Sequence, residues 1–482
     1  MSHADFVALF PLMIVSATAV ILMLSIAIRR NHRTAAAISL IGLAAGLGSL
    51  PFASSVAPRQ VTGFLILDSY SFLYMAILLI ASVFVFLFSY DYLNRRQEQR
   101  EEFYLLVLLA TTGAMVLAAS SNFASFFLGL ELLSVSLYAL IAYIRTERVA
   151  IEAGIKYLVL AASSSSVLLF GLALIYSESG SMKLSQFTAI TSSTGQTSSV
   201  LLLTGLMLTL TGIGFKLAVV PFHLWTPDVY EGAPLPVTAF IATVSKGGMF
   251  ALLLRWFNPQ GEGPAGASGL VLSIIAIASM LTGNLLALRQ TNVKRILAYS
   301  SIAHMGYLLV ALLAGGTLGA PAATYYLMAY LVTILGAFGT MTILSGSRSE
   351  ASSLDSYRGL FWRRPLVAAA FTIMLLSLAG IPLTAGFLGK FYILTAGASQ
   401  SRWVLLFTLV VSSTIGLFYY LRILVVMYAQ PVEPATAKDS STQPLPLPAT
   451  LALAALTGLV FLLGIVPTPF WNVIVAAAHN LS

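Results

Sequence analysis

The sequence predicts an all-α, polytopic integral membrane protein with about fourteen transmembrane helices. Of its 482 residues, 58% are hydrophobic and only 9% are charged, whereas a typical soluble domain has about 25% charged residues. Apolar runs of bilayer-spanning length recur along the whole chain. Because backbone groups in lipid must be satisfied within their own segment, these runs are expected to be helices.

Charge and cysteine content exclude several classes of function. The formal net charge is +8, but the basic residues are spread over short loops, so no nucleic-acid surface is expected. The chain has no cysteine, which excludes disulfides, thiolate zinc sites and cysteine-ligated iron–sulfur clusters within it. No phosphate-binding glycine motif and no metal-ligand spacing is present. We therefore expect no cofactor and no metal in this chain.

The spans are predicted to begin near Asp5, Ala35, Ser69, Phe103, Asn122, Glu152, Ser199, Pro236, Ser268, Asn292, Pro321, Pro365, Arg402 and Leu447. Residues 1–102 hold the first three. The run from Asp5 to Ile28 is too long for a signal-peptide core and has no basic region before it. It is expected to remain as a transmembrane helix.

Lys and Arg are distributed unevenly between alternate loops. Sixteen fall in one set of loops, and only Arg59, Lys183, Arg255 and Arg402 fall in the other. The positive-inside rule places the first set in the cytoplasm and both chain termini outside.

Five basic residues lie inside apolar segments: Lys156, Lys216, Lys246, Lys390 and Arg422. Glu131 is the one carboxylate near the middle of a predicted span. Each such charge costs about 2.5 to 3.5 kcal/mol at the bilayer centre, so these residues must be paired or hydrated and are expected to be functional. Arg422, about two turns from its helix end, is instead expected to snorkel or to pair structurally.

The first five-helix repeat is predicted over residues 103–257. Pro221 has no N–H for the carbonyl of Leu217, so the helix should break beside Lys216. A buried lysine with a movable carboxylate partner can load and release a proton near neutral pH. We expect this role for Lys216 with Glu131; the alternative is a static buried salt bridge.

Three further residues of this repeat are candidates. Lys156 lies a turn or so inside its helix, where it could also snorkel to the interface. Lys246 lies in the middle of its span, and we expect it to be functional. His223 follows the break and is either a proton relay or a histidine satisfied by a carbonyl.

The second repeat is predicted over residues 268–429, and Gly380 and Pro382 should break the helix that carries Lys390. His304 could relay protons between the halves or be satisfied by a carbonyl. Because each set has five helices, the second is inverted relative to the first, as in many transporters. Residues 430–448 are predicted to be a solvated linker before the last helix, in 447–482.

The run GFKLAVVPFHLWTPDVYEGAPLPVTAFIATVSK, residues 214–246, resembles the antiporter-like subunits of type I NADH dehydrogenase, respiratory complex I. The same family includes the multi-subunit cation/proton antiporters. Stretches beginning at Glu102, Thr291 and Leu360 are similar to subunit N of the bacterial complex, with subunit M as the alternative. The resemblance covers nearly the whole chain.

This resemblance implies a site. Glu131 and Lys216 would form the central pair, Lys246 would link the half-channels, and Lys390 would be the terminal proton donor. All of these positions hold the expected residue type.

The resemblance also matches Lys156 to a further buried lysine and His304 to a polar link. It implies proton translocation coupled to quinone reduction, in a bacterial inner membrane. NADH, FMN, iron–sulfur clusters and quinone are expected in other parts of the complex. The expected partners are other membrane-arm subunits, including antiporter-like ones, and membrane lipids. Two alternatives remain: a cation/proton antiporter subunit without a redox partner, and a structural subunit of the membrane arm.

Overall fold

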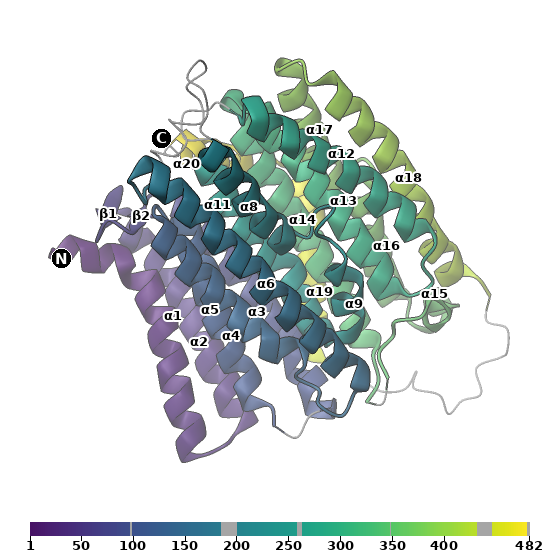
Figure 1. Cartoon of the computed structure of the whole chain (residues 1–482). Helices are drawn as coiled ribbons and strands as arrows, with labels where there is room; N and C mark the ends of the chain where they lie inside the picture. The colour runs from purple at the N-terminus through teal and green to yellow at the C-terminus, as the bar shows by residue number, and fades with distance from the viewer. Residues whose placement is uncertain (97–98, 185–199, 258–262, 348, 431–445, 480–482) are drawn as a thin grey trace.

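The computed structural model describes residues 1–96, 99–184, 200–257, 263–347, 349–430 and 446–479. Within them, thirteen helices are long and apolar enough to cross a membrane. A further span is made by two shorter helices, α16 (Pro365–Ala379) and α17 (Ala385–Ser399), which both pack along α14 (Gly316–Leu344). Each predicted span is matched, and the all-α membrane fold is confirmed; Figure 1 shows the helices gathered in one bundle.

The N-terminal part contains α1 (His3–Ile28), α2 (His32–Ser54) and α3 (Ser69–Arg96). Between α2 and α3, the strands β1 (Arg59–Val61) and β2 (Leu65–Leu67) form an antiparallel hairpin that is absent from the prediction. Its strands have three residues each, too few for an alternating pattern to be recognised. Both chain termini lie near this hairpin in Figure 1.

The next part contains α4 (Glu101–Ala119), α5 (Phe123–Ile141), α6 (Arg148–Ser179), α8 (Val200–Leu217), α9 (Trp225–Gly232), α10 (Leu235–Phe240), η1 (Ile241–Ser245) and α11 (Lys246–Phe257). Two of its spans are irregular. The chain leaves the helix after α8 and re-enters it at α9, while α10 passes into α11 through η1, a π-helical turn.

The following part contains α12 (Gly266–Leu288), α13 (Val293–Ala314), α14, η2 (Leu354–Tyr357), α15 (Leu360–Arg363), α16, α17 and α18 (Trp403–Tyr428). The predicted break in the Lys390 helix is confirmed between α16 and α17. Gly380 ends α16 with a φ of +88°, a left-handed conformation that glycine adopts readily.

The predicted last helix is divided into α19 (Leu447–Ile465) and α20 (Thr468–Ala478). Pro467 cannot donate to the carbonyl of Leu463, and the Tyr325 hydroxyl of α14 donates to it instead. The predicted linker falls largely on residues 431–445, which lie outside the described part of the chain.

Burial separates the centre of the bundle from its outside. Every residue of the span Leu235–Phe257 is buried, and α13 is almost as enclosed, whereas α1, α6, α18 and α19 expose large apolar side chains. Such faces are suited to lipid or to other membrane helices. We call the end of the bundle that carries Arg30, Arg96, Arg148 and Arg295 the arginine-rich end.

Candidate functional site

Lys216 lies in the last turn of α8 and is 4% exposed. Its Nζ donates to Ser134 Oγ of α5 at 3.0 Å and to the Tyr157 hydroxyl of α6 at 3.1 Å. The helix ends one residue later because Ala218 takes a positive φ of 60°. The predicted break beside Lys216 is confirmed, and three helices supply the surroundings of its amine.

Glu131 lies on α5, partly exposed, and accepts a hydrogen bond from Ser165 Oγ of α6 at 2.5 Å. It is near enough to Lys216 for an electrostatic interaction. Among the described residues, however, no basic group lies within the 4.0 Å of an ion pair with it. The two residues are neighbours without direct contact, and Ser134, one turn after Glu131, contacts the lysine instead.

Lys156 is not buried in this chain, since its side chain is 44% exposed on α6. Its Nζ lies 2.7 Å from Glu152 and 2.9 Å from Asp228 of α9, and Asp228 also pairs with Arg295 of α13 at 2.9 Å. The lysine therefore belongs to a charged network at the arginine-rich end. It is exposed because the outward face of α6 has no helix packed on it.

Lys246 is completely buried at the start of α11. Its Nζ donates to Ser301 Oγ of α13 at 2.6 Å and lies 5.8 Å from the ring centre of Tyr230 of α9. Ser301 also bonds the Tyr330 hydroxyl of α14 at 2.6 Å. The preceding π-helical turn η1 shifts the register of the span directly before the lysine, and such turns are frequent at functional sites.

His304 lies on α13, 4% exposed, and is satisfied by tyrosine hydroxyls, not by a carbonyl. Its Nδ1 lies 2.6 Å from the Tyr326 hydroxyl and its Nε2 lies 3.3 Å from the Tyr420 hydroxyl. It interacts electrostatically with both Lys246 and Lys390. Since hydroxyls both donate and accept, either ring tautomer is compatible with these contacts.

Lys390 of α17 is 8% exposed. Its Nζ donates to the carbonyls of Leu378 at 3.0 Å and Ala379 at 2.8 Å, and to Ser413 Oγ of α18 at 2.7 Å. These carbonyls end α16, so the break in the helix supplies the negative end of a helix dipole to the lysine. The ring of Tyr307 lies 5.4 Å away.

Two other predicted residues lie apart from these contacts. His223, in the segment between α8 and α9, is 7% exposed, and its Nδ1 has no hydrogen-bond partner among the described residues. Arg422 donates to the carbonyl of Leu288 at 2.9 Å and to that of Gln290, where α12 ends. Its contacts are those of a structural cap.

These contacts form three groups, around Lys216, around Lys246 with His304, and around Lys390, and electrostatic interactions link neighbouring groups. The groups make a row of polar side chains that crosses the bundle from α5 and α6 to α17 and α18. We call this row the polar axis. Its members are Glu131, Ser134, Tyr157, Ser165, Lys216, Tyr230, Lys246, Ser301, Tyr330, His304, Tyr326, Tyr420, Tyr307, Lys390 and Ser413. Amines, imidazole and hydroxyls all exchange protons, and such a row inside a membrane protein is typical of a proton path.

Two buried ion pairs lie outside the polar axis and are absent from the sequence prediction. Asp68, directly before α3, and Arg255 of α11 pair through two hydrogen bonds of 2.8 and 2.9 Å. Lys294 of α13 and Glu350, which follows α14, lie 2.6 Å apart. Arg255 and Lys294 lie near predicted helix ends, so the sequence analysis counts them as loop residues. Nothing in the local sequence pattern identifies their partners.

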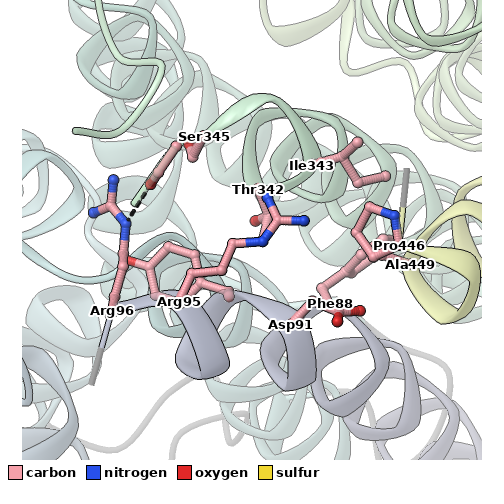
Figure 2. A pocket seen from close by; sticks show the side chains of 11 residues that line it. Phe88, Asp91, Arg95, Arg96, Thr342, Ile343, Ser345, Pro446 and Ala449 are labelled. Atoms are coloured by element: carbon pink, nitrogen blue, oxygen red, sulfur yellow. Dashed lines mark hydrogen bonds between the residues drawn. The ribbon is translucent and has the colours of Figure 1, made fainter. Parts of the chain in front are cut away.

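A small cavity at the arginine-rich end lies between α3, α14 and α19 (Figure 2). Its volume is about 10 Å³, close to the space that one water molecule needs. Asp91 Oδ2 and Arg96 Nη2, from two of its lining residues, have no hydrogen-bond partner in the described part of the chain, while Arg96 Nε donates to the Gly346 carbonyl at 2.8 Å. Each of these atoms suits a water partner, because water both donates and accepts; the two side chains lie on opposite sides of Arg95 in Figure 2.

The sequence pattern of a family described as "NADH:quinone oxidoreductase/Mrp antiporter, TM" matches residues 120–416. The matched residues contain Glu131, Lys216, Lys246 and Lys390. A chain of respiratory complex I from Thermus thermophilus with bound aureothin is 32% identical, with a TM-score of 0.81. The alignment covers 97% of this chain and 99% of that chain.

Two more distant structures share the fold. A chain of the membrane-bound sulfane sulfur reductase, an archaeal respiratory membrane complex, is 23% identical with a TM-score of 0.84, over 99% of this chain and 98% of that chain. A chain of the Mrp complex from Dietzia sp. DQ12-45-1b is 21% identical with a TM-score of 0.85, over 100% of this chain and 98% of that chain.

Proposed function

Because the chain belongs to the NADH:quinone oxidoreductase/Mrp antiporter family of membrane proteins, we propose that it translocates protons as a non-redox subunit of a quinone-reducing respiratory complex. The polar axis carries this proposal. Three buried lysines without a contacting carboxylate are costly unless they have a use, and hydroxyls and a histidine lie among them.

In this mechanism Glu131 controls the proton affinity of Lys216. When the carboxylate moves toward the amine, the protonated lysine is favoured; when it turns back to Ser165, the lysine releases its proton. The proton then passes by way of Lys246 and His304 to Lys390. Moving one charge against 100 mV costs about 2.3 kcal/mol. Since about 1.4 kcal/mol corresponds to a tenfold change in affinity, a change of roughly 50-fold is sufficient.

Quinone reduction occurs elsewhere in the complex in this proposal. The chain has no cysteine for an iron–sulfur cluster, so the clusters are assigned to other subunits. The family resemblance assigns NADH, FMN and quinone to other subunits as well. The exposed apolar faces of α6 and α18 lie at the two ends of the polar axis and are suited to further antiporter-like subunits on either side.

The arginine-rich end is assigned to the cytoplasm and both termini to the periplasm of a bacterial inner membrane. The excess of basic residues in one set of loops supports this orientation. The position of both termini near the β1–β2 hairpin agrees with an even number of spans (Figure 1).

The inverted repeat over residues 103–257 and 268–429 is also part of the proposal. Each set begins with a close-packed helix pair, α4 with α5 and α12 with α13. At both crossings, glycines bring the helices to backbone contact: Gly113 and Gly129 in the first pair, and Gly283 and Gly306 in the second. In both sets the fourth span is broken and carries a lysine.

A second candidate function is exchange of a cation for protons without quinone reduction. The similarity in fold to the Mrp complex chain favours it. Transport assays separate the two functions, because an exchanger moves protons in response to a sodium gradient without NADH.

The test of the proposed function is NADH-driven proton pumping in membrane vesicles that carry Lys216→Ala. We expect at least a tenfold loss of pumping with the complex still assembled, because the variant removes the proton carrier next to Glu131. Assembly is measured in parallel by native gel electrophoresis. Lys183→Ala, at an exposed lysine, is the matched control and should pump like the parent. Unchanged pumping in the Lys216 variant would favour a structural subunit.

A further inference from the structure

The corner between α9 and α10 is buried, yet it interrupts the helix. Helix α9 ends at Gly232 and α10 begins at Leu235. The Ala233 N–H and the Pro234 carbonyl still have helical backbone partners, but the Ala233 carbonyl and the Leu235 N–H have no backbone partner. Lys294 Nζ donates to the Ala233 carbonyl at 2.7 Å, and Thr238 Oγ1 makes a longer hydrogen bond of 3.3 Å to the same oxygen. The Leu235 N–H donates to Glu350 Oε1 at 3.0 Å. One ion pair therefore satisfies the chain on both sides of Pro234.

The pair is well enclosed. The side chain of Lys294 is 1% exposed and that of Glu350 is 12% exposed. The Tyr92 hydroxyl of α3 adds a third hydrogen bond to Glu350, at 2.5 Å. A buried ion pair contributes little stability by itself because desolvation offsets the attraction. Leaving a buried backbone group without a partner is costly, however, so the backbone contacts give this pair its importance.

The same three segments that meet at this corner also surround Lys246. Helix α13 carries Lys294 and, two turns or about 10 Å further, Ser301. Helix α9 carries Tyr230, and the span that starts at Leu235 leads to Lys246. A shift of the corner would therefore move the lysine relative to both of its contacts.

We propose that Lys294 and Glu350 act as positioning residues: their ion pair clamps the α9–α10 corner and so holds Lys246 against Ser301. The inference rests on the proposed role of Lys246 in proton transfer. Burial raises the pKa of Glu350, but Lys294, Tyr92 and the Leu235 N–H outweigh it and hold the pKa below its usual range. The Glu350 carboxylate is thus ionised at neutral pH, and its contribution is lost only as the pH falls through that lowered value.

The first test measures hydrogen–deuterium exchange in the assembled complex. In Glu350→Ala, we expect roughly tenfold faster exchange at the amides of residues 235–246, because the corner loses a buried hydrogen bond. Glu231→Ala is the matched control: Glu231 lies on α9 and pairs with Arg295, but not with the corner backbone. Unchanged exchange over 235–246 in the Glu350 variant would overturn the clamp.

Glu350→Gln provides a milder variant if the alanine variant does not assemble. Glutamine keeps an oxygen acceptor for the Leu235 N–H and removes the charge. Its exchange over 235–246 should be faster than in the parent and slower than in the alanine variant. If the alanine variant does not assemble, the glutamine variant should exchange at close to the parental rate. Exchange as fast as in a variant without any acceptor, such as Glu350→Leu, would contradict the proposal.

The second test exchanges the charges, in Lys294→Glu combined with Glu350→Lys. This double variant can restore an ion pair, but it sets a carboxylate against the Ala233 carbonyl and an ammonium against the Leu235 N–H. The clamp predicts that neither protection of residues 235–246 nor pumping recovers. Recovery of both would show that only the ion pair matters.

Failure of the clamp and failure of the proposed function are distinguishable. If Lys246→Ala pumps normally, the proposed function of the polar axis fails, whereas the exchange measurement still decides whether the clamp exists. If exchange is unchanged but pumping falls in Glu350→Ala, the clamp is wrong and Glu350 acts in another way.

Discussion

The lysines of the polar axis are held by neutral oxygens. Hydroxyls contact Lys216 and Lys246, and two carbonyls with one hydroxyl contact Lys390. A lysine of this kind can lose its proton without leaving a buried carboxylate unpaired, so its surroundings are compatible with both protonation states. Lys294 and Arg255, in contrast, contact carboxylates directly, and removing either cation would leave a buried carboxylate unpaired. The partner thus separates a proton carrier from a structural cation.

Gly380→Ala tests the site of Lys390. A Cβ at this position would lie 2.9 Å from Lys390 Cδ and 3.0 Å from its Nζ, and the φ of +88° disfavours alanine. We expect about a tenfold loss of pumping because the amine is displaced from the carbonyls of α16. The measurement is the ratio of protons pumped to NADH oxidised in vesicles.

Gly458→Ala in α19 is the control for this variant, because a Cβ there meets no atom within 4 Å. It should leave the ratio unchanged. A Gly380 variant that assembles and keeps the parental ratio would show that the geometry around Lys390 does not limit transfer.

At the scale of elements, buried ion pairs join helices that are distant in sequence. One such pair joins Asp68, directly before α3, to Arg255 in the last turn of α11. Asp68 also accepts a hydrogen bond from the Ser71 N–H, and the ring of Tyr70 lies 4.8 Å from the guanidinium of Arg255. The first turn of α3 and the end of α11 are therefore stabilised as a unit.

Arg255→Met should lower the free energy of unfolding by about 3 to 5 kcal/mol, because it leaves the Asp68 carboxylate buried and unpaired. Adding Asp68→Asn should recover at least half of this loss, since asparagine is neutral and still accepts from Ser71. Thermal unfolding of the detergent-solubilised subunit measures both. No recovery in the double variant would mean that packing around Arg255, not the ion pair, causes the loss.

The helices and the breaks follow from local chemistry, and the sequence therefore predicts them. Long apolar runs in lipid must be helices, because their backbone groups have no other partners. Pro221 and Gly380 mark the two breaks, beside Lys216 and between α16 and α17. The π-helical turn before Lys246 has no such local signal. The distance between Glu131 and Lys216 has no local signal either, because it depends on how α5, α6 and α8 pack.

The same limit explains Lys156, which was matched to a buried lysine. It lies off the buried face of α6, which contains Ala153, Tyr157 and Ala161, and its burial depends on whether another helix covers its own face. Asp68, Arg255, Lys294 and Glu350 are likewise assigned to pairs only by tertiary contacts between segments far apart in sequence. The chemistry of single segments was predictable, but contacts between segments were not.

At the scale of the whole molecule, charge is arranged in layers. Within the described part of the chain, ion-pair networks lie at the arginine-rich end, the polar axis crosses the interior, and the Asp68–Arg255 pair lies toward the hairpin end. Since the outer faces of α1 and α18 are mainly apolar, we expect protons to enter and leave near the two ends or across contacts with neighbouring subunits, such as the face of α6 that exposes Ser163 and Ser166.

The direction of pumping depends on which end of the bundle faces the cytoplasm. The two ends of α1 provide labelling sites that determine this orientation. Its 26 residues extend about 39 Å, enough to cross the hydrocarbon core, and both His3 and Arg29 are exposed at its opposite ends. The chain has no cysteine, so His3→Cys and Arg29→Cys each introduce a single thiol. In intact cells, a membrane-impermeant maleimide should label the first variant, and the second only after permeabilisation. The reverse pattern would put the charged network of Lys156 and the Lys294–Glu350 clamp on the outside and would invert the proposed proton path.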